Sequence, residues 1–436
     1  MLQMNKIHFE NLQETLYNEK LDNGLDVYIL PKKGFSKTFV TFTTKYGSID
    51  RTFKPYGQDE FVTVPDGIAH FLEHKMFEKE DGDVFQKFSA LGGSANAFTS
   101  FTRTAYLFSA TENVYENTEE LINFVQAPYF TEETVEKEKG IIAQEITMYD
   151  DMPDWRLYFG TIENLHHEHP VKIDIAGTVE SIDHITADHL YECYETFYHP
   201  SNMVLFVVGA VQPEEMMAFI KNNQQKKTFN APADIVRTFP DEPNHAAVPA
   251  RTIQMDVKKP KFAFGMKCSN VKVAGKEMLT QELAIELLLD CLFGRTSSFY
   301  KEAYESNLID ESFGYSYSQE YGFGFVMIGA DTEQPALLEQ KIRETIEAET
   351  QHWTFGEEDL DRIRKRKIGM FMRSLNSIEF IANQFTRYRF NEMDLFDIVP
   401  TLESIRIEHL QEVFQTLNDE AGFTTFTILP KEETEQ

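Results

Sequence analysis

The chain has 436 residues, of which 42% are hydrophobic and 26% are charged, a composition typical of soluble globular proteins. This length is too great for one hydrophobic core, so we expect two or more domains. The formal net charge of −30 disfavours nucleic acid and anionic lipid as partners. Two explanations of this charge are open: an acidic surface that aids solubility, or an acidic cavity that attracts cationic partners.

The cysteines and the hydropathy favour a cytoplasmic location. Three cysteines lie far apart without a C-x-x-C pair, which excludes a thiolate zinc cluster and a disulfide framework. They are Cys193, Cys268 and Cys291. No apolar run reaches the ~18–20 residues of a membrane span, and the N-terminus has no apolar signal segment. We therefore expect a protein of the reducing cytoplasm that does not bind membranes.

The first half of the chain mixes alternating strand patterns with helical ones. Residues 66–78 are expected to form a helix with Asp66 as its N-cap. In chain order, the expected elements are two strands within 21–48, helices over 66–78 and 81–91, a strand over 95–110, helices over 112–126 and 131–148, and a strand over 203–210.

The second half repeats this order after residues 226–250, a proline-rich stretch without periodicity that we interpret as a linker. The expected elements are a strand over 261–268, helices near 281–293 and 297–306, an alternating strand over 311–330, and helices near 333–351 and 356–375. The sequence therefore predicts an α+β protein with two homologous domains, residues 1–225 and 251–436, each a mainly antiparallel sheet packed with helices.

Two pairs of segments indicate the duplication, because 69–77 aligns by eye with 285–293, and 130–145 aligns with 355–370. The alignment pairs His70 with Glu286, Glu73 with Leu289, His74 with Asp290 and Glu145 with Met370. The second half thus lacks the groups that the first half presents at these positions. A metal site built from them is expected once per chain, in the N-terminal half.

The segment "GIAHFLEHKMFEK", residues 67–79, carries the strongest chemical pattern. On a helix, His70 and His74 share one face, and Glu73 reaches the same space. Zinc favours two such imidazoles, a third protein ligand and one open position for water, and Glu73 can accept a proton from that water. The alternative is an ordinary amphipathic helix with structural histidines.

A third ligand is expected from the helix over 131–148. Glu138 and Glu145 lie two helical turns apart and share a face, so Glu145 can bind a metal while Glu138 orients a ligand. The alternative is that both glutamates are solvated members of an acidic run. A second group, His166 to His169, is interpreted as a solvated loop rather than a metal site, because neighbouring side chains diverge and Pro170 ends any helix.

His70-Phe-Leu-Glu73-His74 is the inverted zinc signature H-x-x-E-H. With it the chain resembles the pitrilysin-type inverzincin metallopeptidases, which include insulysin and the mitochondrial processing peptidase, in their bacterial two-domain form. Glu145 follows His74 by 71 residues (145 − 74), at the spacing of the family's distal glutamate. The segments "GGSANAFTSFTRTAYLF", "HPVKIDIAGTVESI" and "YHPSNMVLFVVGAV" extend the resemblance over residues 20–215.

The resemblance implies a zinc-dependent endopeptidase that hydrolyses short or unfolded peptides in a chamber enclosed by the two domains. It implies one Zn²⁺ per chain, with His70, His74 and Glu145 as ligands. Glu138 would orient one of these ligands, and Glu73 would be the catalytic base. Peptides in this family pair with a sheet edge, here Asn96, Ala97, Phe98 and Thr99. The alternative reading of 95–110 is a core strand whose aromatic residues pack between sheet and helices, and one strand can serve both purposes.

One departure from the family concerns an arginine and a tyrosine that its C-terminal half usually carries. Tyr304 and Asp310 stand near these positions, and the nearby Arg295, Lys301, Tyr315 and Tyr317 do not fit the spacing. Loss of one oxyanion donor costs ~10²–10³ in rate. We therefore expect a homologous partner subunit, in a homodimer or heterodimer, to supply these groups. The alternative function is a non-catalytic peptide-binding or scaffold subunit of a processing-peptidase-like complex.

Overall fold

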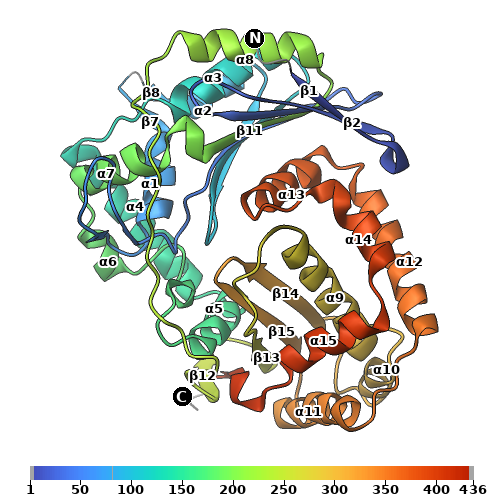
Figure 1. Ribbon diagram of the computed structural model, residues 1–436. Helices are drawn as coiled ribbons and strands as arrows, with labels where there is room; N and C mark the ends of the chain where they lie inside the picture. The colour runs from blue at the N-terminus through green and yellow to red at the C-terminus, as the bar shows by residue number, and fades with distance from the viewer. Residues whose placement is uncertain (1–3, 81, 432–436) are drawn as a thin grey trace. The chain divides into compact units, whose positions relative to one another are not determined.

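The computed structural model describes residues 4–80 and 82–431, which fall into two compact units (Figure 1). Unit 1 consists of Met1–Ile146, Asp174–Phe239 and Ser374–Phe390. Unit 2 consists of Thr147–Ile173, Pro240–Arg373 and Asn391–Gln436. Each unit therefore combines segments from both halves of the chain.

Unit 1 is built on a seven-stranded sheet with the order β1-β2-β3-β11-β4-β10-β9. The strands are β1 (Asn5–Phe9), β2 (Glu14–Lys20), β3 (Asp26–Pro31), β4 (Thr38–Thr44), β9 (Ser94–Thr99), β10 (Thr104–Ala110) and β11 (Met203–Gly209). Only β3 and β11 pair in parallel, and every other neighbouring pair is antiparallel. All seven residues of β4 are buried, which shows that both faces of the sheet are covered at its centre.

Helices cover the sheet of unit 1 on both faces. The helices of the unit are α1 (Ile68–Met76), α2 (Val84–Ala90), α3 (Val114–Val125), α6 (Val179–Asp183), α7 (Ala187–Phe197), α8 (Pro213–Gln225), α13 (Ile378–Phe390) and most of α4 (Glu132–Asp150), and of these α1, α2, α3, α8 and α13 contact the sheet directly. The ring of Phe385 on α13 stacks on Phe206 of β11 at 4.4 Å between centroids. The core cluster on the other face joins α1, α3 and α4 to Val40 and Phe42 of β4. Short pairs β5 (Thr52–Phe53) with β6 (Val62–Thr63) and β7 (Glu78–Lys79) with β8 (Gly82–Asp83) complete the unit.

Unit 2 is built on a five-stranded sheet with the order β12-β16-β13-β15-β14. The strands are β12 (Ala250–Met255), β13 (Lys261–Lys267), β14 (Gly314–Glu320), β15 (Phe323–Asp331) and β16 (Phe423–Pro430). The helices are α5 (Pro153–Leu165), α9 (Gly275–Phe293), α10 (Ser298–Glu305), α11 (Pro335–Gln351), α12 (Glu357–Ser374), α14 (Ile398–Ser404) and α15 (Ile407–Leu417). No helix in the described part of the chain has the length and apolar composition needed to cross a membrane.

The sheets confirm the predicted duplication. The order β3-β11-β4-β10-β9 matches β12-β16-β13-β15-β14 strand for strand, and the one parallel pair lies at the same place in both. Each half of the chain contributes one helix to the unit that is built mainly from the other half. Helix α13 from the second half packs on the sheet of unit 1, and α5 from the first half packs on the sheet of unit 2. Gly160 of α5 permits this close packing, because a Cβ there would lie 2.3 Å from the Phe426 ring.

The expected single strands over 95–110 and 311–330 are each a hairpin. Strands β9 and β10 are joined by a turn in which the Ser100 N–H donates to the Arg103 carbonyl at 2.8 Å. Strands β14 and β15 are joined at Gly322, whose φ of +101° is accessible to glycine at little cost. In both places the aromatic alternation continues through the turn, which is why the pattern resembles one long strand.

The expected N-cap of α1 at Asp66 is wrong. The helix begins after Gly67, which has a φ of +86° and is itself the N-cap residue, while the Asp66 carboxylate pairs with Arg51 at 3.0 Å. A Cβ at residue 67 would lie 2.3 Å from the Ala176 carbonyl oxygen. A close backbone contact with a distant segment therefore determines where α1 begins.

The stretch expected as a linker, 226–250, is anchored to unit 1 at Arg237. The Arg237 Nε lies 2.7 Å from Asp50, and Arg237 forms an isolated β-bridge with Phe53. Two backbone hydrogen bonds join the same segments: the Lys54 N–H donates to the Val236 carbonyl at 3.0 Å, and the Thr238 N–H donates to the Thr52 carbonyl at 3.1 Å. The chain passes into unit 2 only after Phe239.

Glu242 anchors the following residues within unit 2. Its carboxylate accepts the backbone N–H groups of His167, Glu168 and His169 at 2.7–2.8 Å and pairs with the buried Lys267. Burial raises the pKa of Glu242, but these hydrogen bonds outweigh burial and lower the pKa to about 2. The folded state therefore strongly favours the ionised carboxylate.

Glu242→Gln is expected to destabilise unit 2 by about 3 kcal/mol at pH 7, because it leaves the buried Lys267 ammonium without its carboxylate. The stabilisation by Glu242 is present above its ordinary pKa of 4.5 and is lost as the pH falls towards 2. The difference in unfolding free energy between the wild type and Glu242→Gln should therefore become smaller as the pH falls through this range. Urea unfolding followed by tryptophan fluorescence measures this effect, since Trp155 and Trp353 both lie in unit 2. The exposed neighbour variant Glu168→Gln is the control, and equal effects of both variants would contradict the assignment.

Candidate metal centre

Helix α1 positions the first three candidate residues. His70 and Glu73 are 9% and 8% exposed, and His74 is half-buried on the same side of the helix. Phe71, Leu72 and other apolar residues of α1 are buried in the core of unit 1. Because this apolar side is held by packing, the direction of the two imidazoles is set by the helix itself.

Helix α4 brings the distal glutamates to the same place. The Glu145 Oε2 atom lies 3.7 Å from His70 Nε2 and 3.5 Å from His74 Nε2. Glu138 lies two turns earlier, and its Oε1 atom is 3.0 Å from His74 Nδ1. Ile142 and Ile146 bury the adjacent side of α4 in the core of unit 1.

These residues fit a zinc ion. One ligand atom from each of His70, His74 and Glu145 lies within 4.8 Å of the other two. Two atoms bound to a tetrahedral zinc at 2.0–2.1 Å are about 3.4 Å apart, close to the two distances from Glu145. Two imidazoles and one carboxylate are also the donor set of catalytic zinc sites that keep a position for water. Glu138 is hydrogen-bonded to His74 through Nδ1, so the other ring nitrogen, Nε2, remains available to bind the metal.

The two imidazoles have opposite pKa shifts. Burial and, to a smaller extent, the neighbouring His74 lower the pKa of His70 to about 4, against the opposing effect of Glu145 and Glu138. Burial also lowers the pKa of His74, but the hydrogen bond to Glu138 and the nearby carboxylates outweigh burial, and the net shift is upward. The surplus of carboxylates around the imidazoles therefore creates a negative local potential that favours a cation.

The Glu73 side chain is hydrogen-bonded to a residue of the sheet. The Thr99 hydroxyl donates to Glu73 Oε2 at 2.7 Å. Burial raises the pKa of Glu73, and the Thr99 hydrogen bond opposes this rise. A carboxylate with a raised pKa is suited to accept a proton and to release it again near neutral pH.

The residues predicted to bind substrate lie on a sheet edge. Asn96, Ala97, Phe98 and Thr99 belong to β9, the last strand of the sheet, which pairs with β10 alone among the described strands. Asn96 is exposed, and the other three are half-buried. The buried aromatic residues expected of a core strand, Tyr106 and Phe108, lie on β10 instead.

The equivalent place in unit 2 contains ion pairs. Lys367 of α12 lies 2.9 Å from Glu286 of α9, and Arg366 pairs with Asp290. Met370, the counterpart of Glu145, is 61% exposed. Within residues 4–80 and 82–431, only the group in unit 1 has the donors and spacing of a metal site.

The residues near the family's arginine and tyrosine positions are engaged or exposed. Asp310 pairs with Lys259 at 2.8 Å, and Tyr304 is 47% exposed. The Tyr315 hydroxyl donates to Asp290 at 2.6 Å, and the Tyr317 hydroxyl donates to Gln319. Arg295 and Lys301 are exposed.

The interpretation of His166 to His169 as a solvated loop is wrong for two of its members. His166 and His169 are 2% and 3% exposed, because they pack against Phe323 and Phe325 of β15. Burial lowers the pKa of His166 to about 3 and that of His169 to about 4, so both are neutral at pH 7. Their environment is that of structural histidines.

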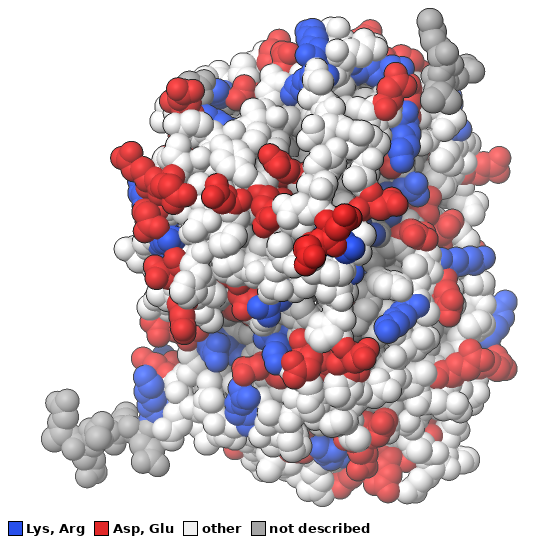
Figure 2. All heavy atoms as spheres, turned by 60° about the vertical axis from the view of Figure 1, so that its left-hand side comes forward, with Lys and Arg blue, Asp and Glu red and all other residues white. Residues whose placement is uncertain are grey.

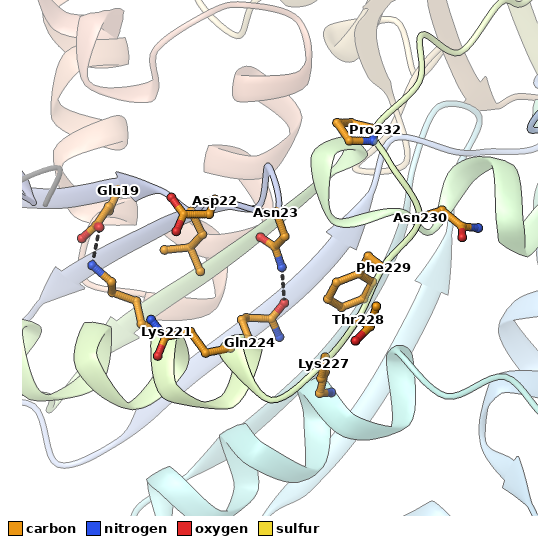
Figure 3. Close-up of a pocket in the computed structure, with 12 residues that line it drawn as sticks. Glu19, Asp22, Asn23, Lys221, Gln224, Lys227, Thr228, Phe229, Asn230 and Pro232 are labelled. Carbon is orange, nitrogen blue, oxygen red and sulfur yellow. Dashed lines mark hydrogen bonds and ion pairs between the residues drawn. The ribbon is translucent and has the colours of Figure 1, made fainter.

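Two features of unit 1 are not foreseen from the sequence. One is the Thr99–Glu73 hydrogen bond, for which the sequence gives no local signal because 26 residues separate the partners. The other is a cavity of about 750 Å³ (Figure 3), where Glu19 pairs with Lys221 and Asn23 donates to Gln224. Its lining shares no residue with the His70–His74–Glu145 group.

Comparisons with known proteins agree with this arrangement. A family model described as Insulinase (Peptidase family M16) matches residues 64–178, and one described as Peptidase M16 inactive domain matches residues 184–367. The uncharacterized zinc protease YmfH of Bacillus subtilis is 57% identical over 98% of this chain and 99% of its own length.

Two solved structures share the fold. An M16-like peptidase from Alicyclobacillus acidocaldarius has a TM-score of 0.92 and 37% identity, and the match covers 99% of both chains. A protease from Helicobacter pylori has a TM-score of 0.81 at 21% identity, over 95% of this chain and 99% of that one. This chain therefore belongs to peptidase family M16, the insulinase family.

Proposed function

We propose that the chain is a zinc-dependent endopeptidase that hydrolyses short or unfolded peptides. The observation that supports this function best is the convergence of His70, His74 and Glu145, with the buried Glu73 beside them. The relatives named as zinc proteases support the same reaction class.

The residues of the centre have separate roles in this proposal. His70, His74 and Glu145 would hold the metal, and Glu138 holds the Nδ1 side of His74. A bound zinc ion supplies Lewis acidity, which polarises a carbonyl oxygen and acidifies water. Glu73 accepts a proton from the attacking water and delivers it to the leaving amine.

The free edge of β9 supports a peptide substrate in extended form. An extended peptide can add to this edge through backbone hydrogen bonds, which carry little sequence preference. Most extended segments of a folded protein are already paired within its sheets, so short or unfolded chains are the expected substrates. On the face shown in Figure 2, acidic and basic side chains are interspersed.

A homologous partner subunit, in a homodimer or heterodimer, is part of the proposal. The spacing of the family's arginine and tyrosine is not matched by Arg295, Lys301, Tyr315 or Tyr317, and Asp310 and Tyr315 are engaged in unit 2. A second subunit would supply these oxyanion donors. We also propose a cytoplasmic location, which the three free, buried cysteines support.

A non-catalytic peptide-binding or scaffold subunit is the other candidate. The match to a domain described as inactive covers residues 184–367 and does not include His70, His74 or Glu145. A chain without catalysis has no need to bury Glu73 beside two imidazoles and two carboxylates. The enzyme is therefore the better supported function.

The metal assignment predicts that Glu145→Gln weakens zinc binding by more than about 100-fold, because it removes a ligand and not merely an outer hydrogen bond. Zinc titration monitored by calorimetry, with metal content measured after dialysis, tests this. Glu133→Gln, an exposed change on the same helix, should bind zinc like the wild type. Equal zinc affinity of the Glu145 variant would exclude Glu145 as a ligand.

The base assignment predicts that Glu73→Gln keeps zinc but lowers turnover by about 10²–10⁴-fold, since the amide cannot accept a proton. A peptide library is incubated with each protein, with and without a chelator, and cleavage is read by mass spectrometry. Cleavage by the wild type should stop with the chelator and return with added zinc. Turnover at the native rate by the variant would refute the role of Glu73.

The partner proposal predicts that a strictly monomeric preparation turns over at least about 100-fold more slowly than the assembled enzyme, because one oxyanion donor is missing. Light scattering after size exclusion gives the oligomeric state, and a quenched fluorescent peptide from the library gives the rate across a dilution series. Full turnover by the monomer would remove the need for a partner.

A further inference from the structure

The contact between Thr99 and Glu73 joins the open sheet edge to the proposed base. Thr99 is the last residue of β9, and its hydroxyl donates to Glu73 Oε2 at 2.7 Å. Within the described part of the chain this is the one side-chain hydrogen bond to Glu73, so the second carboxylate oxygen, Oε1, is left for other partners.

The position of Thr99 is itself fixed by the loop after β4. The Ser48 and Ile49 N–H groups donate to the carbonyls of Ser100 and Phe101 at 3.0 and 3.1 Å. A Cβ on Gly47 would lie 2.4 Å from the Phe101 backbone, so glycine is required for this approach. The turn that follows Thr99 is therefore held by backbone contacts, and the hydroxyl meets α1 without relying on a mobile loop.

We infer that Thr99 is a positioning residue: its hydroxyl holds Oε2 of Glu73 and so presents Oε1 to the reacting water. The inference rests on the proposed endopeptidase function and deepens it. A buried glutamate has three rotatable side-chain bonds, and a single charge-assisted hydrogen bond selects one orientation among them. The role assigned from the sequence, substrate binding, then belongs to the Thr99 backbone, and the side chain serves the base.

This arrangement also couples substrate register to catalysis. A peptide paired with β9 is aligned by the same strand whose last residue holds the base. The distance between a peptide carbonyl and Glu73 is then set along one short, continuous backbone. Sub-ångström placement of this kind is what positioning contributes to rate.

The test compares Thr99→Val, which removes the donor at nearly constant volume, with Thr99→Ser, which keeps the donor. Thr104→Val is the matched control, because Thr104 pairs with Thr99 across the hairpin and its hydroxyl donates to the Tyr46 carbonyl at 2.9 Å, not to Glu73. The probe is a quenched fluorescent peptide that the wild type cleaves, with zinc affinity measured in parallel.

Thr99→Val should lower kcat by about 10- to 100-fold, the loss expected for one hydrogen bond to a charged group, with KM and zinc affinity within about twofold. Thr99→Ser should recover kcat to within about threefold of the wild type. Thr104→Val should lower the melting temperature and leave kcat within about twofold. Wild-type kcat in Thr99→Val, or an equal loss in Thr104→Val, would overturn the inference.

Crystal structures of the wild type and Thr99→Val provide a readout that does not depend on activity. The inference predicts that Glu73 leaves its orientation, or becomes disordered, in the variant only. If the wild type cleaves no peptide, the proposed function fails, and the orientation of Glu73 still decides the positioning role. An unchanged Glu73 orientation in the variant would overturn that role.

Discussion

The packing of α4 against α1 is the constraint on which the candidate centre depends. Neither helix carries the complete donor set, because α1 supplies the imidazoles and α4 supplies Glu145. Phe71 and Leu72 of α1 share one core cluster with Ile142 and Ile146 of α4. A slip of one residue along a helix moves a side chain by 1.5 Å and turns it by about 100°, which would separate the donors. Hydrophobic packing therefore sets the geometry of a polar site.

The two halves of the chain resolve the same problem of buried charge in different ways. In unit 1, two imidazoles lie among carboxylates, and a divalent cation would balance the group. In unit 2, Asp290 and Glu286 are balanced by Arg366 and Lys367, so side chains of the protein supply the positive charge. Charged groups taken out of water require such partners. The duplicated scaffold thus balances its acidic groups with positive charge at this place, and among the described residues only unit 1 has donors arranged for a metal.

The sequence predicts what depends on short spacing and misses what depends on distant contacts. The separations of His70 from His74 and of Glu138 from Glu145 follow from helical geometry, and the structure places all four side chains in one group. The turn after Thr99 contains neither glycine nor proline, and its partners lie in the loop after β4, so a one-strand pattern results. The exchange of α5 and α13 between the sheets is equally invisible, because nothing local to either helix records which sheet it covers.

The edge strand gives the last link between fold and proposed function. Unpaired sheet edges invite aggregation, and proteins usually blunt them with lysine, proline or a bulge. Strand β9, with the sequence SANAFT, has no lysine or proline and pairs regularly with β10 over its whole length. Its small residues leave room for the backbone of another strand to approach. An edge that is open, regular and joined at its end to a buried glutamate is better explained by peptide binding than by the needs of the core.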